Sequence, residues 1–397
     1  MSKRRINWKK VFKRTGWAIL ALIAVVNIVI LIRGDFYIYK AFANTIMKGR
    51  FGPSIDEHDI FYNRTLEAAE PQPWKTHPDY AANNLRQKDL ERFESVETVS
   101  YVVIRNDSLY FEQYWDGFDR NSITNSFSVA KSVVSILIGI AVDEGLIKNI
   151  DEPAGNYVPS FSEDGKEKVT IRHLLTMSSG LDWYESGADP FSDNAEAYYG
   201  WDLEGMVNNM ELETEPGKVF NYQSGNTQAL AMVLEKATGK NISEYTTEKL
   251  WKPLGMMSNG LWNLDGEDGM EKAFCCIYAT ARDYARIGQL FLNGGSWKGE
   301  RIISNAYVQE SVRPADLKDE NGDPNKKYGL SWWMDNYEGV PFYYARGILG
   351  QYIICVPKYQ LVVFRAGHQR GDKRDNDHPE DLYWYIEAAL TMSGYDR

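Results

Sequence analysis

A serine and a lysine three residues apart stand at the start of the longest helix-forming stretch outside the N-terminus. Ser128 and Lys131 lie in the run SFSVAKSVVSILIGIAV at 126–142, which is largely apolar after the lysine. The run predicts a buried helix capped by Ser126 or Ser128. Residues i and i+3 share a helical face, so Lys131 would lie beside the Ser128 hydroxyl near the positive end of the helix dipole. This pair could supply a nucleophile and its base.

The spacing alone does not establish catalysis. An S-x-x-K match is expected by chance in a chain of 397 residues, although Ser128 to Lys131 is the only one present. A serine cap followed by a lysine whose charge reaches solvent would explain the pair equally well. The apolar context favours a catalytic role for the pair, because burying a lysine on the first turn of a helix costs free energy unless the lysine has a partner or a function.

Composition narrows the class of protein. With 44% hydrophobic and 25% charged residues, the chain predicts one large globular domain or one domain with a sizeable insertion. A net charge of −11 and the lack of a basic stripe beyond residue 14 argue against a nucleic-acid partner. Neither a cofactor nor a metal site is indicated by motif or spacing. Cys275, Cys276 and Cys355 imply no disulfide framework, and we expect them to be small core residues.

The N-terminal residues predict a membrane anchor. Residues 1–16 form a basic, cytoplasmic segment, and 17–33 form a transmembrane signal anchor in which Asn27 is the only polar residue before Arg33. At about 1.5 Å per residue the apolar run reaches roughly 25 Å, close to the thickness of a hydrocarbon core. The basic flank predicts a single-pass protein of the cell membrane with its catalytic domain periplasmic or extracellular. A cleaved signal is the alternative, since 41–43 reads Ala-Phe-Ala.

The remaining pattern predicts an α+β fold. We expect a linker and wrapping segment at 34–83 and one large domain at 84–397, with a helical insertion at about 143–312. A hairpin is predicted at 98–115, strands at 328–334, 342–345, 351–357 and 361–367, and helices at 84–94, 170–177, 226–239, 242–255, 280–295 and 379–392. Strands from both ends of the chain would form one mainly antiparallel sheet covered by helices, with a ligand crevice beside the inserted helical subdomain.

Five segments in a fixed order give the chain a family resemblance. They are SVAK (128–131), TIRHLLTMSSGLDW (170–183), PGKVFNYQSGNTQAL (216–230), TARDYARIGQLFLNGG (280–295) and YARGILGQYI (344–353). Together they resemble the serine β-lactamase and penicillin-binding-protein-like superfamily, particularly its class C-like branch with the 6-aminohexanoate-oligomer hydrolases and related esterases. The resemblance covers roughly residues 80–392. It implies a β-lactamase/transpeptidase-like fold and a serine hydrolase that works through an acyl-enzyme.

The resemblance also implies roles for individual residues. Ser128 would be the nucleophile, Lys131 the base and Tyr222 the group that relays a proton to the leaving group. Lys131 would have to be partly desolvated, because a fully hydrated ammonium keeps its proton. The backbone N–H groups of Ser128 and Ile348 would form the oxyanion hole, and Gly347 would leave the strand edge open to substrate.

Departures from the family pattern bear on the substrate. Ser224 stands two residues after the tyrosine, where many relatives have asparagine, and 345–347 reads Ala-Arg-Gly in place of Lys-Thr-Gly or His-Thr-Gly. Arg346 either replaces the missing cation or points to solvent. Trp183 and Tyr184 would line the cleft. These departures disfavour β-lactamase activity and favour cleavage of an amide or ester in a small or peptide-like substrate.

Two alternatives stay open at this point. An exported domain would face the cell wall, which fits a D-alanyl-D-alanine carboxypeptidase or another peptidoglycan-modifying enzyme. A non-catalytic peptidoglycan-binding or sensor domain could also retain the fold, although the complete set of Ser128, Lys131 and Tyr222 argues against it. We expect a structural role for His173, which occupies a helix position beside apolar neighbours. The oligomeric state is not predicted.

Overall fold

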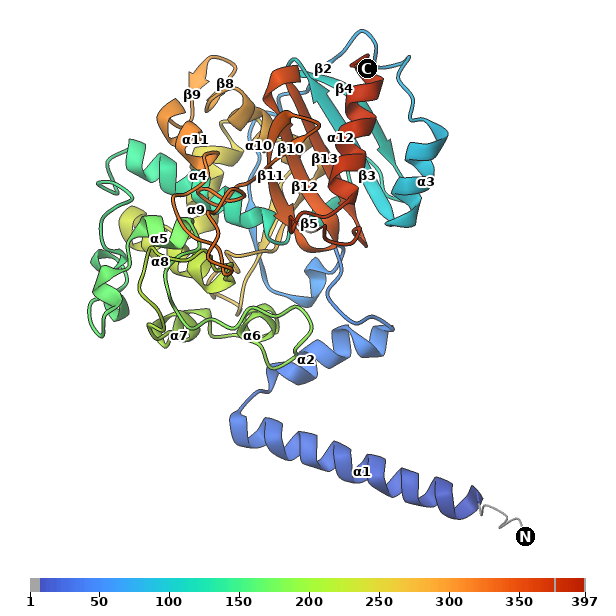
Figure 1. The fold of residues 1–397 in the computed structure, drawn as a ribbon, viewed down its shortest axis with the longest axis vertical. Helices are drawn as coiled ribbons and strands as arrows, with labels where there is room; N and C mark the ends of the chain where they lie inside the picture. Colours follow the sequence, from blue (N-terminus) through green and yellow to red (C-terminus); the bar gives the residue numbers. More distant parts are fainter. Residues whose placement is uncertain (1–7, 375, 396–397) are drawn as a thin grey trace.

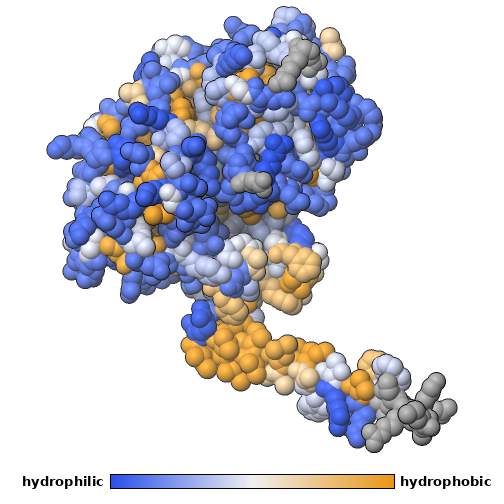
Figure 2. All heavy atoms as spheres, in the orientation of Figure 1, coloured by the Kyte–Doolittle hydropathy of each residue, from blue (hydrophilic) through white to orange (hydrophobic). Residues whose placement is uncertain are grey.

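A long N-terminal helix stands apart from the body of the protein in the computed structural model, which describes residues 8–374 and 376–395 (Figure 1). Helix α1 (Trp8–Arg33) is long and apolar enough to cross a membrane. It is exposed, with an apolar surface over most of its length and hydrophilic residues toward its start (Figure 2), and Ile30 is its one buried residue. The first seven residues of the predicted basic segment lie outside the described residues.

The main sheet has seven strands in the order β10-β11-β12-β13-β3-β4-β2. Its strands are β2 (Lys75–Thr76), β3 (Thr98–Arg105), β4 (Ser108–Tyr114), β10 (Trp333–Tyr337), β11 (Val340–Gly347), β12 (Gln351–Val356) and β13 (Leu361–Gly367). All neighbours are antiparallel except β2 and β4. The N- and C-terminal parts of the chain meet where β13 pairs with β3, which confirms the predicted sheet built from both ends of the chain.

Helices cover both faces of this sheet, so that alternate residues of its central strands enter two separate cores. On one face lie α4 (Val129–Asp143) and α10 (Ala281–Leu292), with Tyr284 stacked on Phe364 at 4.9 Å between ring centroids. On the other face lie α3 (Gln87–Ser95) and α12 (Asp381–Met392), with Phe93 and Tyr385 in contact at 4.6 Å. Figure 1 shows α3 and α12 on the side of the sheet that faces away from the helical region.

The helical region contains a small sheet that the sequence did not predict. Its helices are α5 (Ile171–Leu175), α6 (Asp193–Tyr199), α7 (Leu203–Asn208), α8 (Ser224–Thr238), α9 (Ile242–Thr246) and α11 (Asn305–Ser311). Four antiparallel strands form this sheet in the order β1-β6-β7-β5, with β1 at Asn63–Leu66, β6 at Gly260–Asn263, β7 at Ile277–Thr280 and β5 at Ile123–Asn125. A separate pair is formed by β8 (Ser296–Trp297) and β9 (Glu300–Arg301). Strands of two to four residues are too short to show a period, and β1 comes from the segment expected to be a linker.

Two further expectations differ from the structure. The strand expected at 328–334 begins only at Trp333, because Ser331 has φ +62° and its N–H donates to the carbonyl of Leu175 instead of a neighbouring strand. The segment 34–83 is more ordered than expected. It holds α2 (Tyr37–Asn44) and two 3₁₀ turns, η1 (Ile46–Lys48) and η2 (His58–Ile60), in addition to β1 and β2.

Candidate active site

The candidate nucleophile lies on a tight turn between β5 and α4. Ser126 holds the turn to β7, because its N–H donates to the carbonyl of Ile277 at 2.7 Å and its hydroxyl oxygen accepts from the N–H of Ile277 at 3.1 Å. The next residue, Phe127, has φ +42°, a conformation that bulky side chains rarely adopt. Such strain often marks a functional turn.

Ser128 occupies the N-cap position of α4 without capping it. Its side chain accepts no bond from the backbone of the first turn, so the expected serine cap is wrong. The Ser128 hydroxyl is instead in contact with Lys131, whose Nζ lies 3.0 Å from Oγ.

Lys131 is buried and uses all three of its N–H donors on oxygen atoms. Besides Ser128, its ammonium donates to the hydroxyl of Ser224 at 3.1 Å and to the carbonyl of Phe274 at 3.0 Å. The rings of Tyr222 and Phe274 lie 5.1 and 5.6 Å from Nζ. Only 1% of the residue is exposed, and none of these partners is a carboxylate. Lys131 is therefore held against Ser128 in a desolvated setting.

Glu185 joins this group although the sequence analysis did not single it out. Its Oε1 accepts from the Ser224 hydroxyl at 2.9 Å, and its Oε2 accepts from the Ser224 N–H at 2.7 Å and from Trp183 Nε1 at 3.0 Å. Because Ser224 is the first residue of α8, the carboxylate also lies at the positive end of that helix. A continuous chain of hydrogen bonds thus runs from Ser128 through Lys131 and Ser224 to Glu185.

Tyr222 stands at the wall of the same site. Its ring contacts Trp333 at 5.5 Å and Tyr328 at 6.0 Å between centroids. The next residue, Gln223, donates to the carbonyls of Leu181 and Trp183, which ties the tyrosine segment to the segment that carries Glu185.

Gly347 lies at the end of β11, directly against the turn of the nucleophile. A Cβ at this position would lie 2.4 Å from the carbonyl oxygen of Ser126 and 3.2 Å from Cβ of Phe127. Ile348 follows it and is 46% exposed, and Leu349 then turns the chain with φ +61°. The strand end therefore passes close against Ser126 and Phe127, the two residues that precede Ser128.

A cavity of about 1300 Å³ adjoins this group of residues. Trp183, Tyr184, Tyr222, Trp333 and Arg346 are among its lining residues. Acidic residues at 319–323 contribute to its lining, and cations at 326–327 and 373–374 also line it. Of the two orientations left open for Arg346, the structure has the one that lines the cavity.

Arg346 is fixed in that position by two contacts. Its guanidinium carbon lies 3.5 Å from the centroid of Trp333, and Nη1 donates to the carbonyl of Asp377 at 3.0 Å. The Asp377 carboxylate is itself paired with Lys327 and Lys373, and these partners lower its pKa to about 2. Beside it, burial lowers the pKa of His378 to about 4, and its Nδ1 shares a hydrogen bond of 2.7 Å with the Tyr344 hydroxyl.

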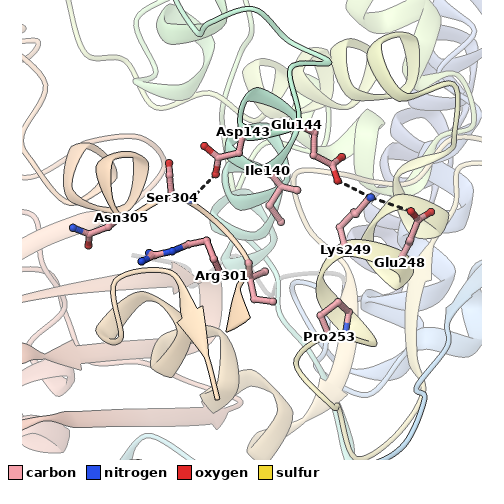
Figure 3. Close-up of a pocket in the computed structure, with 10 residues that line it drawn as sticks. Ile140, Asp143, Glu144, Glu248, Lys249, Pro253, Arg301, Ser304 and Asn305 are labelled. Carbon is pink, nitrogen blue, oxygen red and sulfur yellow. Dashed lines mark hydrogen bonds and ion pairs between the residues drawn. The ribbon is translucent and has the colours of Figure 1, made fainter. Parts of the chain in front are cut away.

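A second cavity, of about 550 Å³, lies at the opposite end of α4 from Ser128 (Figure 3). Lys249 bridges Glu144 at 2.6 Å and Glu248 at 3.0 Å, and Asp143 accepts from the backbone N–H of Ser304. Lys249, Glu144 and Glu248 are thus paired with one another, and the lining residues do not include a nucleophile in contact with a base. The second cavity is therefore not a candidate active site.

Two other sequence expectations can be compared with the structure here. Cys275 and Cys276 are joined by a disulfide, against the expectation of free core residues, and they directly follow Phe274, whose carbonyl binds Lys131. Cys355 is free and buried as expected. His173 completes a capping box with Thr170 at the start of α5, which agrees with a structural role.

A mainly antiparallel sheet with helices on both faces lies next to a helical region, and the covering helix α4 carries a serine and a lysine at its start. This arrangement defines the β-lactamase-like class of fold. The Beta-lactamase family model matches residues 87–384, and the chain belongs to this family.

Two of the relatives are named as hydrolases. The chain is 28% identical over 304 residues to the 6-aminohexanoate-dimer hydrolase of Paenarthrobacter ureafaciens, covering 70% of this chain and 75% of the relative. It is 25% identical over 247 residues to the teichoic acid D-alanine hydrolase of Staphylococcus aureus, covering 60% of this chain and 58% of the relative. The protein is accordingly a hydrolase.

Solved structures show the same fold at lower identity. A Bacillus anthracis protein described as a candidate 6-aminohexanoate-dimer hydrolase superposes with a TM-score of 0.73 at 22% identity, covering 86% of this chain and 94% of the other. A family VIII carboxylesterase superposes with a TM-score of 0.62 at 19% identity, covering 82% and 100%.

Proposed function

We propose that the protein is a serine hydrolase that cleaves an amide or ester bond through an acyl-enzyme on Ser128. The observation that carries the proposal is the contact of 3.0 Å between Lys131 Nζ and Ser128 Oγ at the start of a buried helix. The chain's membership in a family of hydrolases supports it.

In the acylation step, Ser128 Oγ attacks the substrate carbonyl while its proton passes to the unprotonated amine of Lys131. The C=O bond opens to an oxyanion, which the N–H groups of Ser128 and Ile348 stabilise. Collapse of this intermediate breaks the bond to the leaving nitrogen or oxygen, which takes a proton relayed by Tyr222. Water then attacks the acyl ester with the same groups acting in reverse, and Ser128 regains its proton.

Ser224 and Glu185 position the base in this mechanism. The Glu185 carboxylate can only accept hydrogen bonds, so the Ser224 hydroxyl donates to it and presents a lone pair to Lys131. The lysine is thereby held within reach of Ser128, and the oxygen dipoles around it compensate the positive charge that it gains with the serine proton.

The substrate-binding residues would be Trp183, Tyr184, Ser224, Arg346 and Gly347. A linear amide or ester fits the open cavity, and the relatives named for a 6-aminohexanoate dimer and for D-alanine on teichoic acid act on substrates of these two kinds. Arg346 would contact an anionic group of the substrate.

A second candidate is a peptidoglycan-modifying enzyme such as a D-alanyl-D-alanine carboxypeptidase. It is favoured by α1, which we propose to be an uncleaved signal anchor with a cytoplasmic N-terminus and a periplasmic or extracellular body. In this division, 17–33 is the anchor, 34–83 the wrapping segment and 84–397 the hydrolase domain.

A substrate panel with the detergent-solubilised full chain tests the proposal. We expect turnover of p-nitrophenyl esters, linear amides or D-alanyl esters that is lost in Ser128→Ala. Release of D-alanine from muropeptides, together with a lasting penicillin adduct, would favour the carboxypeptidase. No turnover in any assay would favour a non-catalytic binding domain.

A further inference from the structure

The segment that follows α1 includes α2 and lies under the body of the protein. One side of this segment packs against the body. At the start of α2, the hydroxyl of Tyr37 donates to the carbonyl of Pro190 at 3.1 Å, and further along the helix the ammonium of Lys40 lies 4.3 Å from the ring centroid of Phe61. Figure 1 shows α2 between α1 and the helical region, next to α6. One side of α2 is thus already occupied by the protein itself.

The other side of this segment exposes large apolar side chains. We call it the juxtamembrane face, and it consists of Phe36, Phe42, Ile46, Met47 and Phe51. Met47 is 72% exposed and Phe51 is 96% exposed. A single exposed apolar residue is ordinary, but five within sixteen consecutive residues form a patch that indicates a partner. Figure 2 shows apolar surface at the base of the body, next to α1.

A hydrogen bond between α1 and α2 gives the depth of this face. The hydroxyl of Tyr39 donates to Oδ1 of Asn27 at 2.7 Å, and Asn27 lies six residues before the end of α1 at Arg33. At 1.5 Å per residue, the Tyr39 hydroxyl therefore lies level with a point on α1 about 9 Å from the end of the helix. Amphipathic helices that lie on membranes sink by a similar distance, about 5–10 Å.

The position of the face next to α1 favours a lipid surface over a second copy of the chain. Its residues directly follow the exposed apolar side chains of α1 in the sequence, so a membrane that accepts α1 would also meet the face. Three cations of this segment are already engaged: Arg33 pairs with Asp35, Arg50 pairs with Glu57, and Lys40 lies against Phe61. Lys48 is exposed beside the face, where an anionic lipid headgroup would complement it.

We propose that the juxtamembrane face binds the interfacial region of the lipid bilayer beside α1. The proposal rests on the proposed membrane anchorage and goes beyond it, because the body is then held by two adjacent lipid contacts. The same segment touches the loop of the active site: Arg33 lies 5.6 Å from the ring centroid of Phe191, and this loop continues back to Glu185.

Lipid quenching of a fluorophore on the full chain in anionic liposomes tests this. Single cysteines at Phe42→Cys, Met47→Cys and Phe51→Cys would be labelled, since Cys275 and Cys276 are bonded to each other and Cys355 is buried. Ile23→Cys in α1 reports the anchor. Glu300→Cys in β9, at the opposite end of the body, is the unquenched control (Figure 1).

In separate preparations, with lipids that carry the quencher near the headgroup or at the end of the acyl chain, we expect the first to quench 42, 47 and 51, the second to quench Ile23→Cys, and neither to quench Glu300→Cys. Quenching at Ile23→Cys alone would overturn the lipid contact and leave the anchor in place. A signal at 42, 47 and 51 that rises with protein density and is insensitive to lipid quencher would assign the face to a second copy. No quenching at Ile23→Cys would refute the anchor and this proposal with it.

Discussion

The carboxylate of Glu185 accepts hydrogen bonds from both the backbone N–H and the hydroxyl of Ser224, at 2.7 and 2.9 Å. This double contact fixes the direction of a hydroxyl that would otherwise rotate freely. Ser224 can then accept a hydrogen bond from Lys131 at 3.1 Å.

Glu185→Gln should lower kcat of ester hydrolysis about 10- to 100-fold with little change in KM, because an amide N–H facing Ser224 reverses its hydroxyl and disturbs Lys131. Glu320→Gln, which changes another carboxylate of the cavity lining, is the matched control and should leave kcat unaltered.

A double-mutant cycle separates this positioning role from loss of structure. If Glu185 acts through Ser224, adding Glu185→Gln to Ser224→Ala should cost less than about threefold in kcat. Equal losses in both backgrounds would show that Glu185 acts by another route.

Gly347→Ala should lower kcat about 100-fold, because the methyl group would collide with the Ser126 carbonyl and move the strand end away from the oxyanion. The matched control is Gly52→Ala, where an added methyl meets nothing within 4 Å. Unchanged kcat in Gly347→Ala, with both variants folded by circular dichroism, would remove Ile348 from the proposed oxyanion hole.

Arg346→Gln should raise KM about tenfold for a substrate with a carboxylate near the scissile bond and leave KM for a neutral p-nitrophenyl ester unchanged, since only the first substrate forms a charge-assisted bond. Arg374→Gln removes another cation from the lining and serves as control. An equal rise in KM for both substrates would indicate that Arg346 shapes the cavity and does not bind an anion.

His378 should make stability fall in mild acid. Burial lowers its pKa in the folded protein from 6.5 to about 4, so the unfolded chain binds a proton first as the pH falls. The contribution of neutral His378 to the free energy of unfolding is fully present above about pH 7, and about 2 kcal/mol of it should be lost by pH 5.

Urea denaturation at pH 7 and pH 5 measures this loss. His378→Gln should show a smaller decrease in the free energy of unfolding between the two pH values than the unaltered chain. Equal decreases in the two proteins would mean that His378 does not carry the pH dependence.

The parts of the site that the sequence revealed are those encoded locally. Ser128 and Lys131 are neighbours on one helical turn, so their spacing predicts their contact. Tyr222 and Gly347 came from a resemblance between ordered motifs, since nothing in their local pattern distinguishes them from packing residues. The centre of the main sheet was predicted because β3, β12 and β13 are largely apolar over six to eight residues.

Other features depend on contacts that a linear pattern does not contain. Glu185 meets Ser224 across 39 residues, and only its position after the aromatic pair at 183–184 hints at a site. The strands of the small sheet are stabilised by partners far away in the chain, as with Asn63 and Asn263 in β1 and β6. The order of the segment 34–62 likewise comes from its packing against α6.

Intact mass spectrometry of the full chain after reaction with a fluorophosphonate tests the acyl-enzyme on Ser128 most directly, because this probe stops at the covalent stage. One adduct per chain, mapped to Ser128 by peptide analysis and absent in Ser128→Ala along with ester turnover, is the expected result. An adduct on another residue, or ester turnover that persists in Ser128→Ala, would contradict the proposed nucleophile.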